Sequence, residues 1–161
     1  MFFQNFPNTF FEINKDNRVI VTDFIRAIKI DPRLKDNDIF YVFYEAQDGE
    51  MPEIISHKVY GTTMYHWVIM AINERFDPYN DFPKADSILL KYTEEKYGDI
   101  NGIHHYEDAN GNWVDVFTVG GIPITNIEHE RKENEKKRTL KILKRDVLEE
   151  FVTQYEELIA V

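Results

Sequence analysis

Cysteine is absent from this sequence of 161 residues. The chain therefore forms no disulfide, offers no thiolate to a zinc ion and has no cysteine nucleophile. Long apolar runs are missing too, so we expect no helix that spans a bilayer and no membrane partner. The first eleven residues contain Pro7 but no Lys or Arg, a composition that does not fit a secretory signal. These absences predict a soluble protein that is compatible with a reducing compartment.

Basic residues are outnumbered, with 19 Lys and Arg against 29 Asp and Glu and a net charge of −10. Such a surface repels phosphates, so we expect no nucleic-acid partner. An acidic mimic or inhibitor of nucleic-acid binding is a third interpretation, and it rests on charge alone. The charge is uneven, because residues 128–145 hold eight basic and four acidic residues. This segment includes Lys136, Lys137 and Arg138, which we predict either to contact an acidic neighbour or to form a solvated helix end.

Glycine is scarce, with seven residues, and none of them forms a phosphate-binding loop. No Ser or His stands in the setting of a nucleophile elbow. Scattered carboxylates could pair in space, as a glycosidase requires, but nothing in the sequence indicates such a pair. We therefore predict no enzyme activity, no catalytic residue and no cofactor.

Phenylalanine is concentrated at the start of the chain, where residues 1–11 read MFFQNFPNTFF. Pro7 and the absence of a helical period predict an extended arm that cannot bury its rings by folding on itself. The arm packs either on its own domain, as a first strand, or on a neighbouring subunit. The candidate partner-contact residues are Phe2, Phe3, Phe6, Phe10 and Phe11.

A strand followed by two helices is the most informative pattern. Ile39–Glu45 is rich in aromatic and branched residues and predicts a strand. Pro52 suits the first position of a helix that ends at Gly61. Residues 64–72 then place an apolar stripe at helical spacing, which predicts a helix buried on most sides. Trp67 lies in that stripe, and we interpret it as a core residue.

The remaining elements follow from periodicity and turn signals, and together they predict a mixed α+β order. Thr22-Asp23 precedes a short helical turn that Pro32 stops. Asn110-Gly111 predicts a type I′ hairpin, and Asp146 with Glu149 predicts a capping box. The expected elements are a helix over 84–97 with Ile88 on its apolar face, a hairpin of 103–107 and 113–119, an exposed helix over 128–138, a strand over 139–143 and a helix over 146–159.

Two segments resemble metal sites at first sight. His104 and His105 are adjacent, and neighbouring residues of a strand face opposite sides, so the two rings cannot converge without a bulge. Asp108 begins a calcium-type loop, but Trp113 stands where such a loop needs glycine. We therefore predict a surface hairpin and no metal site.

Several motifs indicate a family. Gly49-Glu50-Met51-Pro52, Tyr60-Gly61 and Asn73 resemble the first half of a LysM module. The longer string VYGTTMYHWVIMAINERFDPYNDFP at 59–83, with KYGDINGIHHYED at 96–108 and residues 134–159, is more specific. It resembles the baseplate wedge proteins of contractile-tailed phages, of the gene product fifty-three type. The resemblance covers about residues 39–159.

The sequence patterns and the resemblance together predict an organisation of the chain. Residues 1–38 would form an arm and a short helical turn, and residues 39–161 a LysM-like domain. Its β-α-α(-β) core would enclose an inserted helix and hairpin over 78–137, and the C-terminal helix over 146–159 would follow. Thr139–Leu143 would then pair with Ile39–Glu45.

The resemblance also implies a function in the virion, after assembly in the host cytoplasm. The protein would join wedge subunits around the central hub, in multiple copies around the tail axis, by contacts with other wedge and hub proteins. The alternative is a LysM-type module that binds peptidoglycan or another glycan. Met51, where such modules carry threonine, and the late second strand disfavour that alternative.

Overall fold

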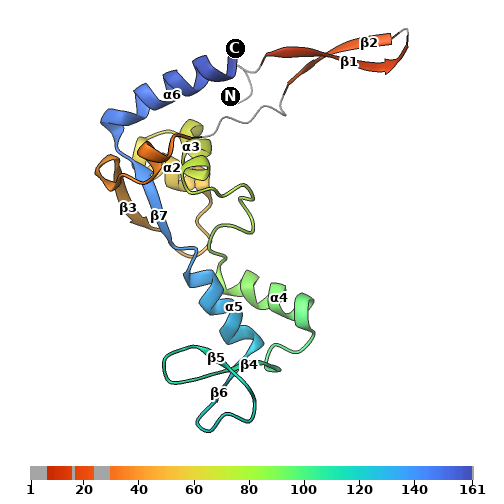
Figure 1. Cartoon of the computed structure of the whole chain (residues 1–161), viewed down its shortest axis with the longest axis vertical. Coiled ribbons are helices and arrows are strands. Elements are labelled where there is room, and N and C mark those ends of the chain that lie inside the picture. The colour runs from red at the N-terminus through yellow and green to blue at the C-terminus, as the bar shows by residue number, and fades with distance from the viewer. Residues whose placement is uncertain (1–6, 16, 24–29, 161) are drawn as a thin grey trace. The chain divides into compact units, whose positions relative to one another are not determined.

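A computed structural model describes residues 7–15, 17–23 and 30–160 of the chain (Figure 1). The chain divides into two compact units. Unit 1 comprises residues 1–44, 52–76 and 141–161, and unit 2 comprises residues 45–51 and 77–140. Helices alternate with small sheets, which confirms the predicted α+β class. Among the described residues, no helix is both long and apolar enough to cross a membrane.

Unit 1 begins with an antiparallel hairpin of β1 (Asn8–Asn14) and β2 (Asn17–Thr22). The described part of the predicted arm is therefore extended, but it is half of a hairpin whose second strand was not predicted. The helical turn predicted near 24–28 lies outside the described residues. A helix instead begins at Pro32, the residue expected to stop one: α1 (Pro32–Lys35) starts where the Asp31 carboxylate accepts the Arg33 N–H at 2.8 Å.

The predicted strand and two helices are present. A short 3₁₀ helix, η2 (Asp38–Phe40), leads into β3 (Tyr41–Glu45), and α2 (Pro52–Tyr60) follows. Gly61 ends α2 with a φ of +81°, a conformation that favours glycine. The Thr62 hydroxyl then caps η3 (Thr63–Tyr65), which continues into α3 (His66–Ile72). Pro52, Gly61 and Thr62 thus act as the sequence predicts.

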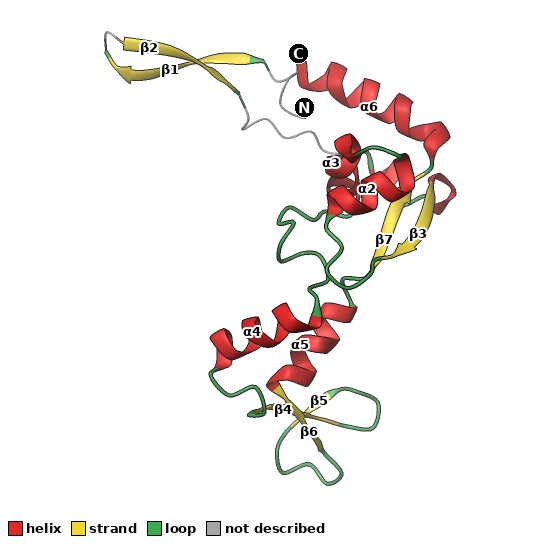
Figure 2. Ribbon diagram, turned by 180° about the vertical axis from the view of Figure 1, so that it is seen from behind, coloured by secondary structure: helices red, strands yellow, loops and turns green. Residues whose placement is uncertain are grey.

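Two strands about one hundred residues apart pair with each other. β7 (Thr139–Leu143) lies beside β3, as predicted (Figure 2). The Lys144 N–H donates to the Phe40 carbonyl, and the Ala46 N–H donates to the Arg138 carbonyl, so the strands run antiparallel.

Asn73, at the end of α3, fixes this pair to the helices. Its Nδ2 donates to the Lys141 carbonyl and its Oδ1 accepts from the Lys141 N–H, both at 2.8 Å. The same Nδ2 donates to the Ile69 carbonyl at the helix end, also at 2.8 Å. One amide thereby closes the helix and holds the middle of β7.

An apolar core joins these elements. Its buried members come from β3, α3, β7 and the last helix, and they are Tyr41, Val68, Ile72, Leu143 and Leu148. Ile55 of α2 is fully buried as well. Val68 and Ile72 belong to the apolar stripe that helical spacing predicts over residues 64–72.

The C-terminal helix α6 (Arg145–Ala160) packs its apolar face on this core. It begins one residue earlier than predicted, because the Lys144 carbonyl accepts the N–H groups of Val147 and Leu148. Asp146 therefore lies inside the first turn, and the predicted capping box is wrong.

Unit 2 contains α4 (Asp86–Tyr97), β4 (Ile103–Glu107), β5 (Trp113–Val114), β6 (Ile122–Thr125) and α5 (Asn126–Glu135). The three strands form an antiparallel sheet in the order β5-β4-β6. Gly98 ends α4 with a φ of +77°, as predicted. Ile88, which the apolar pattern assigned to the buried face, is exposed.

The hairpin turn between β4 and β5 differs from the prediction. A type I′ turn needs a positive φ at both central residues, yet only Gly111 has one, at +80°, while Asn110 does not. The Asp108 carboxylate instead accepts the N–H groups of Asn110 and Asn112, and so organises the loop. The predicted strand 113–119 is reduced to two residues, and β6, which was not predicted, pairs with the other edge of β4.

Helix α5 was predicted to be exposed, and this prediction is wrong. A capping box of Thr125 and Glu128 starts the helix at Asn126, two residues earlier than expected. One face is buried although it is largely polar, because each inward group is paired. Asn134 exchanges two hydrogen bonds with the Lys84 backbone, at 2.8 and 3.0 Å. Glu130 accepts from Lys96 and from the Tyr97 hydroxyl, both at 2.8 Å.

Candidate functional site

The β1–β2 hairpin presents apolar side chains on both of its faces. Residues directly opposite each other share a face, so Phe10 lies beside Ile20 and Phe11 beside Val19. We name these the Phe10 face and the Phe11 face. Phe10 is 71% exposed, Ile20 66% and Phe11 59%. Packing one face on another surface would therefore leave apolar side chains on the opposite face.

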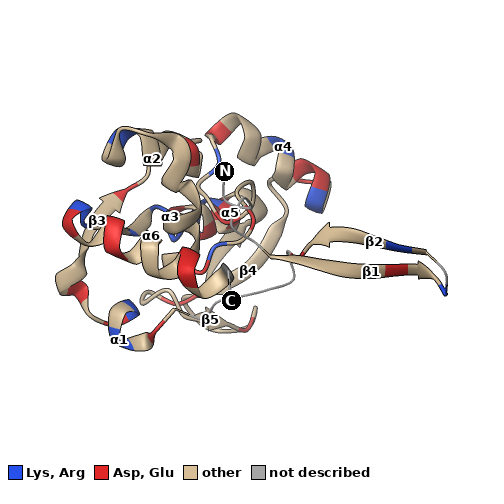
Figure 3. Cartoon of the chain, turned by 90° about the horizontal axis from the view of Figure 1, so that it is seen from above, with Lys and Arg blue, Asp and Glu red and all other residues tan. Residues whose placement is uncertain are grey.

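Charge on the hairpin is confined to a small part of it. Glu12 and Arg18 pair across the strands, with Arg18 Nε 2.7 Å from the carboxylate. The strands otherwise consist mostly of neutral residues (Figure 3). The backbone groups on the outer edge of each strand have no ladder partner within this two-stranded sheet.

The predicted aromatic contact residues are only partly described. Phe10 and Phe11 lie on β1, and they point to opposite faces. Phe2, Phe3 and Phe6 lie outside the described residues.

The basic candidates Lys136, Lys137 and Arg138 follow α5. Arg138 Nε donates to both Glu135 carboxylate oxygens at 2.8 Å, and its other nitrogens reach Asp48 and the Ala46 carbonyl. Arg138 is therefore used within unit 2. Lys137 donates to the Asn80 carbonyl at 2.7 Å, whereas Lys136 pairs with Glu133 on an open surface.

Trp67 occupies the core position that its stripe predicts. It is half-buried against the core, and its ring lies 4.8 Å from that of Tyr155 and 6.2 Å from that of Phe151. Both partners belong to α6, so this aromatic group joins α3 to the C-terminal helix.

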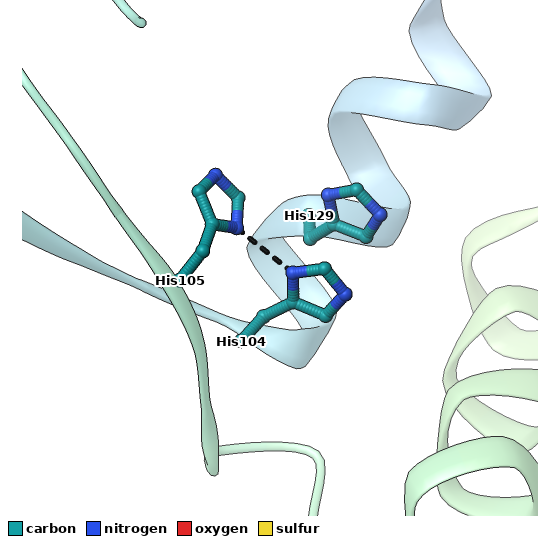
Figure 4. A group of neighbouring side chains, drawn as sticks. All are labelled: His104, His105 and His129. Carbon is teal, nitrogen blue, oxygen red and sulfur yellow. Dashed lines mark hydrogen bonds between the residues drawn. The ribbon is translucent and has the colours of Figure 1, made fainter. Parts of the chain in front are cut away.

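Three histidines converge in unit 2, although a regular strand was predicted to send His104 and His105 to opposite sides unless a bulge intervened. The register between β4 and β6 advances two residues on β4, from Ile103 to His105, and one residue on β6. His104 is thus the extra residue of a β-bulge, the condition under which neighbouring rings can turn to one side. Figure 4 shows both rings next to His129 of α5.

The histidine cluster, defined as His104, His105 and His129, is tightly packed. The Nδ1 atoms of His104 and His105 are 2.8 Å apart. The rings of His104 and His129 stack at 3.8 Å between centroids. One nitrogen from each of the three rings lies within 4.8 Å of the others.

A carboxylate orients the cluster. Glu107 Oε1 lies 3.0 Å from His105 Nε2, and Glu107 Oε2 pairs with the Lys132 ammonium. Hydrogen bonds from Lys132 and then His105 lower the pKa of Glu107, so it is ionised at neutral pH. An ionised carboxylate accepts only, which places the proton of His105 on Nε2 and leaves the Nδ1 lone pair facing His104.

The surroundings of His104 and His129 favour their neutral imidazoles. Burial, followed by repulsion from His129 and His105, lowers the pKa of His104. Burial also lowers the pKa of His129. The indole of Trp113 stacks on His105 at 4.0 Å between centroids, and the His105 side chain is 7% exposed. Neutral imidazole nitrogens in such a setting are ligands for transition-metal ions.

Sequence reasoning missed β2 and His129, although signals for both exist. Residues 19–21 are Val-Ile-Val, a branched run typical of a strand. Thr125 and Glu128 have the spacing of a capping box, which would have placed His129 in the first turn of a helix. The bulge at His104 has no comparable signal.

Comparison with known families identifies the class of protein. The family model that matches is described as Base plate wedge protein 53, and it aligns with residues 2–119, which are 118 of the 161 residues. The chain belongs to this family of phage baseplate wedge proteins. It is therefore a structural protein of the virion tail, which confirms the family that the motifs at 59–83 and 96–108 indicated. No curated protein matches the chain.

The matched region contains one candidate contact surface and omits the other. The whole β1–β2 hairpin lies inside residues 2–119, whereas the basic segment 136–138 lies outside them. The match gives no support to the glycan-binding alternative.

Proposed function

We propose that this protein joins wedge subunits around the central hub of the baseplate, and that the β1–β2 hairpin makes the main contact. The observation that carries the proposal is a strand pair with exposed apolar side chains on both faces. A two-stranded hairpin alone in water is marginally stable, so it gains order when another protein covers it. The occupant is a neighbouring baseplate protein.

Burial of the exposed apolar side chains of the hairpin supplies enough free energy to stabilise a contact with another protein. Full burial of a large apolar side chain contributes roughly 1.5–3 kcal/mol. Phe10, Phe11 and Ile20 are all available for burial. Within the described two-stranded sheet the outer strand edges have no ladder partner, and a partner strand can bind their backbone groups by extending the sheet.

The basic segment is a smaller proposed contact. Lys136 and Lys137 would meet an acidic neighbour, while Arg138 mainly holds the turn around Asp48 in place. Exposed ion pairs are weak, so this contact orients the subunit more than it secures it.

We also infer that β3, α2, α3 and β7 form a LysM-like element with residues 78–137 inserted before its second strand. The element order, the antiparallel strands and the Asn73 amide support this inference. In the proposed role the element is a scaffold without turnover, in copies repeated around the tail axis, assembled in the host cytoplasm.

Deleting residues 1–22, which removes the whole hairpin, tests the proposal. Docking on a partner predicts an almost unchanged melting temperature and loss of incorporation into baseplates in a complementation assay. A fall of many degrees in the isolated protein would show that the hairpin belongs to its own core, and the proposal would be wrong.

A matched pair of variants separates contact from exposure. F10S combined with I20S removes the apolar pair of the Phe10 face and should reduce incorporation strongly. F117S changes a phenylalanine of unit 2 that is at least as exposed and should leave incorporation intact. Equal incorporation of both variants would contradict the proposal.

A further inference from the structure

We propose that His104, His105 and His129 bind one transition-metal ion, with Zn²⁺ the ion that the ligand set suits. The site does not depend on the proposed baseplate contact. Three imidazole nitrogens with an open fourth position form a common protein donor set for zinc. Imidazole also suits Ni²⁺, Cu²⁺ and Co²⁺, which makes these ions usable probes.

The spacing of the three rings is close to what a metal ion needs. Zinc–nitrogen bonds of about 2.0–2.1 Å in a tetrahedron place ligand nitrogens roughly 3.3 Å apart. The observed separations run from 2.8 Å, between His104 Nδ1 and His105 Nδ1, to at most 4.8 Å. Because the rings of His104 and His129 are parallel to within 9°, one of them must turn out of the stack to direct its lone pair at the same ion.

The cluster has the second layer of contacts that metal sites use. In such sites a carboxylate commonly accepts the far N–H of a ligating histidine, which fixes the tautomer and aims the lone pair. Glu107 stands in this relation to His105, and Lys132 holds Glu107 from its other oxygen. A metal ion would replace the proton that His104 and His105 share between their Nδ1 atoms, and that proton would move to the other nitrogen of His104.

The β-bulge gives the proposal its structural basis. A regular β4 strand would send His104 and His105 to opposite faces. The extra residue turns both rings toward α5, where the capping box of Thr125 and Glu128 places His129 in the first turn. A bound ion would then tie β4 directly to α5 within unit 2.

Calorimetric titration of the untagged full chain with Zn²⁺ tests the site, with Co²⁺ absorption as a second readout. We expect saturable binding of one ion per chain and visible bands of tetrahedral Co²⁺ with nitrogen ligands. At a hundredfold excess of Zn²⁺ over Kd, the melting temperature of the folded protein should rise by roughly 5–10 °C.

Three variants of the site and one control variant make the test specific. H104Q and H129Q should each lose the Co²⁺ bands and the thermal shift, while E107Q should weaken binding by about 10–100-fold. H57Q changes an exposed histidine of α2, far along the chain from the cluster, and should bind as the wild type does. Circular dichroism of the metal-free variants measures whether each remains folded.

Three results would overturn the proposal of a metal site. They are the absence of stoichiometric binding by the folded wild type, undiminished binding by H104Q and H129Q, or equal loss in H57Q. If H129Q fails to fold, H104Q decides, because His104 lies at an unpaired bulge position.

Discussion

The two units of the molecule differ in how many polar side chains they bury. Unit 1 packs Val68, Leu143 and Leu148 into an apolar core. Unit 2 turns Glu130 and Asn134 of α5 inward, with exposed fractions of 6% and 5%. A polar helix face can be buried in this way because each inward group has a partner. Apolar periodicity therefore predicts burial in unit 1 and misses the buried polar face of α5 in unit 2.

Both units nevertheless share one device. Asn73 binds the N–H and the carbonyl of Lys141 in unit 1, and Asn134 binds the same two groups of Lys84 in unit 2. In each case the amide of a helical or helix-terminal asparagine holds a backbone segment that is distant in sequence. The two units differ in the side chains that surround this asparagine amide.

The largest expected difference in stability between the two units concerns their tryptophans, Trp67 in unit 1 and Trp113 in unit 2. W67A should destabilise the protein by about 3–5 kcal/mol, because it removes a large ring from between α3 and α6. W113A should cost about 1 kcal/mol or less, since Trp113 is mostly exposed and contributes chiefly a ring stack on His105. Urea unfolding of both variants measures the difference. An unchanged stability for W67A would show that Trp67 is a surface platform.

The second-largest loss of stability is expected for the substitution N73A. N73A removes three hydrogen bonds and leaves the Lys141 backbone groups without their partners, at a cost of about 2–3 kcal/mol. The control is N101A, which alters an exposed asparagine and should change stability by about 0.5 kcal/mol at most. Equal stabilities for the two variants would mean that water replaces the Asn73 amide.

Replacing Asn134 should reduce the stability of the protein less than replacing Asn73. N134A removes two hydrogen bonds to the Lys84 backbone, one fewer than N73A removes. We expect a loss of about 1–2 kcal/mol. A larger loss than that of N73A would reverse the comparison and make the polar interface of unit 2 the more demanding one.

Amide exchange compares the strands without a mutation. Because β7 pairs with β3, the amides of Leu140 and Ile142 should exchange as slowly as that of Val42. Fast exchange at 139–143 together with slow exchange at Val42 would show that the pairing is not maintained in solution.

The sequence was sufficient where one physical signal dominated. Pro52 and Gly61 mark the two ends of α2, because steric limits on the backbone act locally. The apolar stripe of residues 64–72 identifies the buried helix, because the spacing of apolar residues is also a local signal. The alternation in 139–143 and the family resemblance together predicted a strand whose partner lies about one hundred residues away. The family followed from the motifs at 59–83 and 96–108.

The sequence was insufficient where the outcome depended on contacts across the fold. Glu130 is buried because Lys96 and Tyr97 reach it, and no local pattern shows that. Although burial opposes ionisation, these two hydrogen bonds hold the pKa of Glu130 below its ordinary value. Likewise, His104 and His105 converge through a bulge that is visible only against the register of β6.

The most direct test of the central proposal is photo-crosslinking at Phe10 in assembled baseplates. A photoreactive phenylalanine analogue at position 10 should crosslink to another baseplate protein, while the same analogue at Phe117 should not. Crosslinks from position 10 that remain within the chain, or that match those from position 117, would contradict a hairpin that docks on a neighbouring subunit.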